Sequence, residues 1–126
     1  MTESSTRKNA AIEFLQLVAS GKVRDGFDRF VGPGFRHHNP YFAGDPDSLK
    51  AAMEAAAAEN PLTTLEVQRT LQDGDLVAVH SKLRHEPNDR GLATVHICRF
   101  EGERIVEMWD LWLAPPENSP NQNGMF

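Results

Sequence analysis

The sequence predicts an α+β fold in which three N-terminal helices pack on one bent, mostly antiparallel sheet. Apolar residues recur at helical spacing as far as residue 60, and beyond it they alternate in segments separated by short glycine-containing turns. A length of 126 residues is typical of one domain. We therefore expect a single domain over residues 1–126, with irregular tails at 1–5 and 115–126.

Two helices are expected before the first turn-rich segment. The first is predicted from an apolar stripe that ends at Gly21, a left-handed stop, and that consists of Ala11, Phe14, Leu15 and Val18. The second is predicted over residues 23–31 from its own apolar spacing. Gly32-Pro33-Gly34 cannot continue a helix and should end it.

The third helix has the clearest start signals in the chain. Asp45 is a good N-cap, and Pro46 suits the first helical position. Its predicted apolar side consists of Leu49, Met53, Ala56 and Ala57, and Asn60-Pro61 closes it. Between the second and third helices, the segment around His37-His38-Asn39-Pro40 is expected to be a short extended stretch.

Four strands are expected in the second half of the chain. They are predicted over residues 62–71, 76–83, 92–100 and 105–113. The three connections between consecutive strands are short, and each contains a glycine, within residues 73–75, 88–91 and 101–103. Neighbouring strands joined in this way are antiparallel.

Composition excludes several classes of protein. The net charge is −5 and the 13 basic residues are scattered, which is unlike a nucleic-acid binder. No apolar run approaches the roughly 20 residues of a membrane span, and the N-terminus does not resemble a secretory signal, so a cytoplasmic protein is expected. Cys98 is the only cysteine and is expected to be a small buried hydrophobe.

Side chains of a strand point alternately to its two faces, so every second residue of the last three predicted strands should share a face. One face collects the ionisable residues His80, His96 and Asp110 among apolar neighbours, which would be costly without a pocket to hold them. The other face is more uniformly apolar, and it includes Val77, Val79, Ser81, Ile97, Trp109 and Leu111. We expect a homodimer through that second face.

The two adjacent histidines should point to opposite faces, so that only one of them enters a pocket. A metal site built from His38, His80, His96 and Asp110 is chemically possible. The spacing does not favour it, because no H-x-H, H-x-x-x-H or short His–carboxylate pair lies on one element. We expect no metal and no cofactor.

The order of these segments resembles the SnoaL-like polyketide cyclase group of the nuclear transport factor 2-like superfamily. The resemblance is carried by His37-His38-Asn39-Pro40, residues 74–80 (GDLVAVH), Arg99-Phe100 before a glycine turn, and residues 104–110 (RIVEMWD). It implies a cone-shaped barrel with an internal pocket, frequently dimeric, and ring closure by an aspartate and histidines without metal or cofactor. It assigns His38 to the family's H-x-P position and Asp110 to the acid after the tryptophan. Related proteins often carry an acid where this chain has His96, and a histidine where it has Met108.

Residue chemistry and resemblance together predict a cyclase, isomerase or lyase type of enzyme that removes a proton next to a carbonyl. Asp110, its pKa raised by an apolar pocket, would be the base, and a histidine would stabilise the oxyanion. The expected catalytic set is Asp110, His38, His80 and His96. The expected contacts to a small apolar carbonyl compound are His37, Asn39, Tyr41, Phe100, Met108 and Trp112. The alternative is a non-catalytic ligand-binding or assembly module of the same fold.

Overall fold

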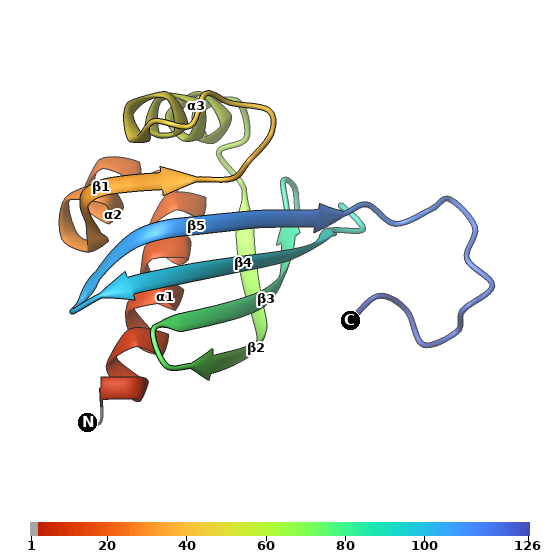
Figure 1. The fold of residues 1–126 in the computed structure, drawn as a ribbon. Coiled ribbons are helices and arrows are strands. Elements are labelled where there is room, and N and C mark those ends of the chain that lie inside the picture. Colours follow the sequence, from red (N-terminus) through yellow and green to blue (C-terminus); the bar gives the residue numbers. More distant parts are fainter. Residues whose placement is uncertain (1–2) are drawn as a thin grey trace.

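A computed structural model describes the backbone of residues 3–126 and the side chains of residues 6–126. Three helices and five strands follow one another in the chain (Figure 1): α1 (Glu3–Ala19), α2 (Val23–Phe30), β1 (Val31–His37), α3 (Pro46–Glu59), β2 (Thr64–Asp73), β3 (Leu76–Arg84), β4 (Leu92–Glu101) and β5 (Arg104–Leu113). The three predicted helices and four predicted strands are present. Residues 3–5 are helical where an irregular tail was expected, and residues 1–2 lie outside the described part of the chain.

The helices end and begin where their local chemistry dictates. Gly21, with φ +89°, follows α1 in the left-handed conformation that glycine adopts without strain. The Asp45 side chain accepts a hydrogen bond of 2.8 Å from the backbone N–H of Ser48 and so caps α3. Leu49 is the one fully buried residue of α3, and Met53, also expected on the apolar side, is partly buried and packs against the core. Ala56 and Ala57 lie on the same side but are exposed or half-buried, so α3 is attached to the fold by few fully buried side chains.

The sheet is mixed and open, with strand order β1-β5-β4-β3-β2. β2 to β5 form an antiparallel meander, and β1 pairs parallel with β5 at one edge. β1 runs through Gly32-Pro33-Gly34, where only a break was predicted, because an edge strand with an irregular register tolerates proline and glycine. Glycine is required at position 32, since a Cβ there would lie 2.9 Å from the Cβ of Arg104.

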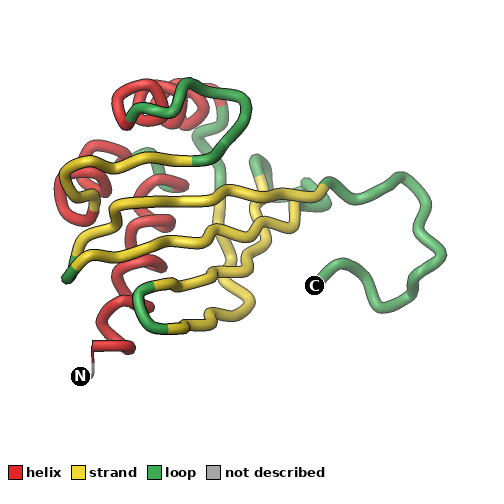
Figure 2. Tube along the Cα trace, in the orientation of Figure 1, coloured by secondary structure: helices red, strands yellow, loops and turns green. Residues whose placement is uncertain are grey.

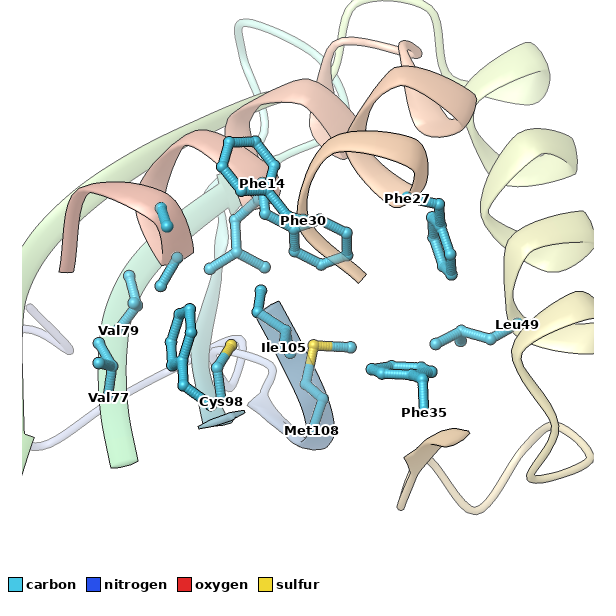
Figure 3. Packing of buried hydrophobic residues seen from close by; sticks show 14 of the residues in the cluster. Phe14, Phe27, Phe30, Phe35, Leu49, Val77, Val79, Cys98, Ile105 and Met108 are labelled. Carbon is cyan, nitrogen blue, oxygen red and sulfur yellow. The ribbon is translucent and has the colours of Figure 1, made fainter. Parts of the chain in front are cut away.

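The core lies between the helices and one face of the sheet, here called the inner face (Figure 3). Phe14 of α1 meets Phe27 of α2 edge to face, with ring centroids 5.6 Å apart. Below these rings lies the apolar part of the inner face, formed by Val77, Val79, Cys98, Phe100, Ile105 and Met108. Cys98 is fully buried, as expected, and burial raises the pKa of its thiol to about 12.

Strand register corrects the predicted division of residues between the two faces. Cross-strand partners in an antiparallel pair point to the same side. Val79 pairs with His96, which pairs with Asp110, whereas His80 pairs with Val95. His80 therefore lies on the opposite face, called the outer face, and the prediction that it shares a face with His96 and Asp110 is wrong. Alternation holds along β3 itself, but β3 is out of phase with the expected grouping by one residue. In β5 alternation fails at a bulge opposite Arg99 and Phe100, so Ile105 joins the core although Glu107, two residues on, faces outward.

The last twelve residues form neither helix nor strand and extend away from the body of the molecule (Figure 2). The tail then turns back, and the ring of Phe126 stacks on His80 with centroids 6.1 Å apart. No helix in the described part of the chain is long and apolar enough to cross a membrane.

Candidate functional site

A polar cluster interrupts the otherwise apolar inner face. His96 of β4 and Asp110 of β5 are direct cross-strand partners, and His96 Nε2 lies 3.2 Å from Asp110 Oδ1. Asn39, in the loop after β1, donates from Nδ2 to the other oxygen, Asp110 Oδ2, over 2.8 Å. The side chains of His96 and Asp110 are 13% and 16% exposed, so the pair is largely shielded but still reaches solvent.

The electrostatics of Asp110 differ from the sequence-based expectation. Burial is the largest single influence on its pKa and acts to raise it. The hydrogen bonds from His96 and Asn39, together with the charges of His96 and His37, outweigh burial, and the pKa is lowered overall. The expected raised pKa is therefore wrong. Asp110 is held as a carboxylate, which makes it a weak base and a strong hydrogen-bond acceptor.

Two polar atoms near this pair are buried without a hydrogen-bond partner among the described residues. They are Nδ1 of His96 and Oγ of Ser81. A carboxylate only accepts, so Nε2 of His96 carries a proton toward Asp110, and whenever the ring is neutral Nδ1 is the acceptor. Ser81, fully buried, pairs with Thr94, the inner-face residue next to His96 on β4. The inner face thus holds an unpaired acceptor and an unpaired hydroxyl, both buried.

Sequence reasoning missed Ser81, because it assigned this residue to the other face. The available signal was a lone serine at an alternate position after Val77 and Val79, where a buried strand would otherwise place an apolar side chain.

The two adjacent histidines point to opposite sides of β1, as alternation predicted. His37 is buried, donates from Nε2 to the carbonyl of Ala43 over 2.7 Å and accepts at Nδ1 from the backbone N–H of Asn39 over 3.1 Å. Both of its ring nitrogens therefore hold the loop that presents Asn39 to Asp110. His37 is the member of the pair on the Asp110 side, which corrects the expectation that His38 shares a cavity with His96 and Asp110.

His38 belongs to a charged cluster on the outer face. It donates from Nε2 to Glu107 over 2.7 Å and stacks on Trp109 with centroids 5.0 Å apart. Arg36 and Arg99 also donate to Glu107, over 3.0 and 2.9 Å from their Nε atoms. The His38 hydrogen bond, followed by those of Arg99 and Arg36, lowers the pKa of the buried Glu107 to about 2 against the opposing effect of burial.

The remaining predicted contacts divide between core and rim. Phe100 and Met108 are fully buried in the core. Trp112 lies on the inner face two residues beyond Asp110, and its ring centroid lies 6.4 Å from that of Tyr41. Both rings are exposed, at 50% for Trp112 and 70% for Tyr41, and they form an aromatic rim beside the polar cluster. The described residues contain no group of three or more potential metal ligands.

Comparison with known proteins supports this architecture. The family model of the SnoaL-like domain matches residues 11–108. The chain belongs to the SnoaL-like domain family. No curated protein matches its sequence.

Solved structures with the same fold include a SnoaL-like protein of unknown function from Burkholderia thailandensis, with a TM-score of 0.74 and 16% identity, covering 90% of this chain and 99% of the other. A proposed isomerase of the SnoaL-like family from Agrobacterium tumefaciens has a TM-score of 0.70 and 13% sequence identity, and the match covers 87% of this chain and 99% of the other. A proposed polyketide cyclase from Acidithiobacillus ferrooxidans has a TM-score of 0.70 and 17% sequence identity, and the match covers 89% of this chain and 91% of the other. At these identities the likeness shows the fold, three helices on a five-stranded sheet, and leaves activity to the site itself.

Proposed function

We propose that this SnoaL-like protein is a cofactor-independent enzyme of the cyclase or isomerase type that removes a proton next to a carbonyl, with His96 as the base. The observation that carries the proposal is the state of the His96 ring. Its Nε2 contacts the Asp110 carboxylate at 3.2 Å, while Nδ1 has no partner among the described residues. An imidazole oriented by a carboxylate on one nitrogen and unpaired on the other is the usual arrangement of a general base.

Asp110 acts through His96 in this mechanism. Its lowered pKa keeps it ionised, so that it fixes the tautomer of His96 and stabilises the imidazolium formed when Nδ1 takes the α-proton. Asn39 holds the second carboxylate oxygen and keeps Asp110 in that orientation. The hydroxyl of Ser81 is the available donor for the developing enolate oxygen.

The exposed rings of Tyr41 and Trp112 would contact the apolar part of a carbonyl substrate at the rim. Proposed isomerases and cyclases among the structures of the same fold are compatible with this chemistry.

The test is deuterium exchange at the acidic carbon of a simple 1,3-dicarbonyl probe, acetylacetone, followed by proton NMR. We expect exchange above the buffer rate with the wild-type chain, and a loss of about 10² to 10⁴-fold in His96→Gln, the range that a positioned general base contributes. His80→Gln is the matched control, because it removes an imidazole from the outer face, and it should exchange at the wild-type rate. Exchange at the buffer rate with the wild type, or full activity in His96→Gln, would instead favour a non-catalytic ligand-binding module.

We further propose that the outer face joins two copies of the chain. An apolar hollow of about 260 Å³ on this face is lined by Leu76, Ile97, Trp109 and Leu111. Leu111 is 58% exposed, and contiguous exposed apolar surface of this kind marks an interaction site. A twofold axis through the face would bring the same patch together from both copies.

Sedimentation velocity tests this second proposal. Leu111→Glu places a charge in the patch and should convert a dimer to a monomer. Leu62→Glu is the control, since Leu62 is equally exposed, at 60%, but precedes β2 and lies outside the patch. A monomeric wild type, or a dimer that survives Leu111→Glu, would contradict the proposal.

A further inference from the structure

A hollow lies at one end of the inner face, beyond Ser81, where α1 and α3 meet the end of β3. Its volume is about 140 Å³. Six of its eight lining residues are apolar, and the full set is Val18, Ala19, Met53, Ala56, Ala57, Thr63, Leu83 and His85. This set is called the α3 groove below. Neither the polar cluster nor the outer-face patch includes any of these residues.

The size of the α3 groove limits what it can hold. An apolar protein cavity of about 150 Å³ accommodates one benzene molecule. A groove of 140 Å³ with an apolar lining therefore suits a single six-membered aromatic ring.

His85 adds a specific polar requirement to this apolar groove. Its Nδ1 is buried and has no hydrogen-bond partner among the described residues. Its backbone N–H donates to Asp89 Oδ2 over 3.2 Å, which fixes the residue immediately after β3. A buried polar atom without a partner costs free energy that a ligand can recover. A ring nitrogen of neutral histidine is either a donor or an acceptor, and a hydroxyl group can pair with both.

We propose that the α3 groove is a binding site for a monocyclic phenol, with the ring against Met53, Ala56 and Leu83 and the hydroxyl on Nδ1 of His85. This assignment rests on the volume, lining and unpaired nitrogen of the groove, and not on the proton-transfer reaction proposed above.

Because α3 has few buried contacts, we expect the width of the groove to adjust to a bound ring. Leu49 is the single fully buried side chain of α3, and another hollow, of about 430 Å³, lies beside the helix against Gly21, Val23 and Ala58. An element with few buried contacts moves at low cost. A small shift of α3 therefore admits the ring without disturbing the sheet.

The experiment is a ¹H–¹⁵N NMR titration of the whole chain with phenol, and with benzene as the matched probe that lacks the hydroxyl. In the wild type we expect saturable shifts at Ala56, Ala57 and Leu83 and on the His85 ring nitrogens, with phenol binding about tenfold more tightly than benzene. His85→Leu should remove that tenfold preference and leave benzene binding intact.

A second variant tests the groove without touching the histidine. Ala56→Leu fills the groove and should weaken both probes at least tenfold. Ala55→Leu adds the same side chain at a neighbouring exposed position of α3 that does not line the groove, and it should bind both probes as the wild type does. Equal affinity of phenol and benzene for the wild type, absent binding, shifts confined to another surface, or equal behaviour of the two alanine variants would each overturn the proposal. Because no step measures proton exchange, failure here is distinct from failure of the proposed reaction.

Discussion

The two faces of the sheet each carry a carboxylate beside a histidine, and these two clusters differ in how completely their polar groups are paired. On the outer face, Glu107 receives hydrogen bonds from Arg36, His38 and Arg99. On the inner face, Asp110 is held by Asn39 and His96, while Nδ1 of His96 is buried without a partner among the described residues. The residues of the two sites are interleaved along the same strands, so the difference arises from which side each one faces.

This difference separates a structural role from a functional one. Buried polar groups in folded proteins are nearly always hydrogen-bonded, and a catalytic role is one of the reasons for an exception. The outer cluster leaves Glu107 saturated, as expected of a group that ties β1, β4 and β5 together. The inner cluster keeps an unfilled acceptor and donor, as expected of a site that awaits a substrate.

The largest effect on stability should come from the outer carboxylate. Glu107→Gln keeps the shape of the side chain but removes the charge that pairs with Arg36, His38 and Arg99. We expect thermal denaturation at pH 7 to show a melting temperature lowered by about 5 °C or more. Asp110→Asn should lower it by less, because the inner carboxylate has fewer partners. A larger loss in Asp110→Asn would contradict the division of roles between the faces.

The pH dependence of the difference in melting temperature between wild type and Glu107→Gln shows whether the charge of Glu107 causes it. The pKa of Glu107 is about 2 in the folded chain and 4.5 in the unfolded reference. A depressed folded-state pKa stabilises the protein fully above the unfolded value and progressively less as the pH falls through the folded value. The difference in melting temperature between wild type and Glu107→Gln should therefore be constant above about pH 5 and shrink between pH 4.5 and 2. A difference that persists at pH 2 would point to lost packing instead of lost charge.

Much of the fold could be predicted from the sequence, because its signals are local. Asp45-Pro46 marks the start of α3, and the glycine turns at 73–75 and 101–103 mark two hairpins. The pairing of β1 with β5 was missed, since a parallel edge strand joins segments about 70 residues apart and leaves no local signature. Its Gly-Pro-Gly sequence also resembles a break.

The candidate site was predicted only in part, for a related reason. His96 and Asp110 share a face because β4 and β5 are joined by a tight turn that fixes their relative phase. The connection from β3 to β4 spans residues 85–91, and its length does not fix the phase of β3, so His80 was grouped with the inner face and Ser81 with the outer one. His38 was preferred over His37 from its match to a family motif, whereas the contacts of β1 place His37 on the inner side.

The smallest expected effect on stability comes from Ser81→Ala. This variant tests directly whether the Ser81 hydroxyl of the inner cluster lacks a hydrogen-bond partner. A buried hydroxyl without a partner costs free energy in the folded state, so its removal should leave the melting temperature unchanged or raise it by one or two degrees. Thr94→Val is the matched control, because Thr94 is the cross-strand neighbour of Ser81 and its hydroxyl donates to the Ser81 carbonyl over 3.4 Å. That variant loses a hydrogen bond and should be the less stable of the two. If Ser81→Ala destabilises the chain more than Thr94→Val does, the Ser81 hydroxyl has a partner in the folded protein, and among the described residues Nδ1 of His96 is then the one unpaired atom left in the inner cluster.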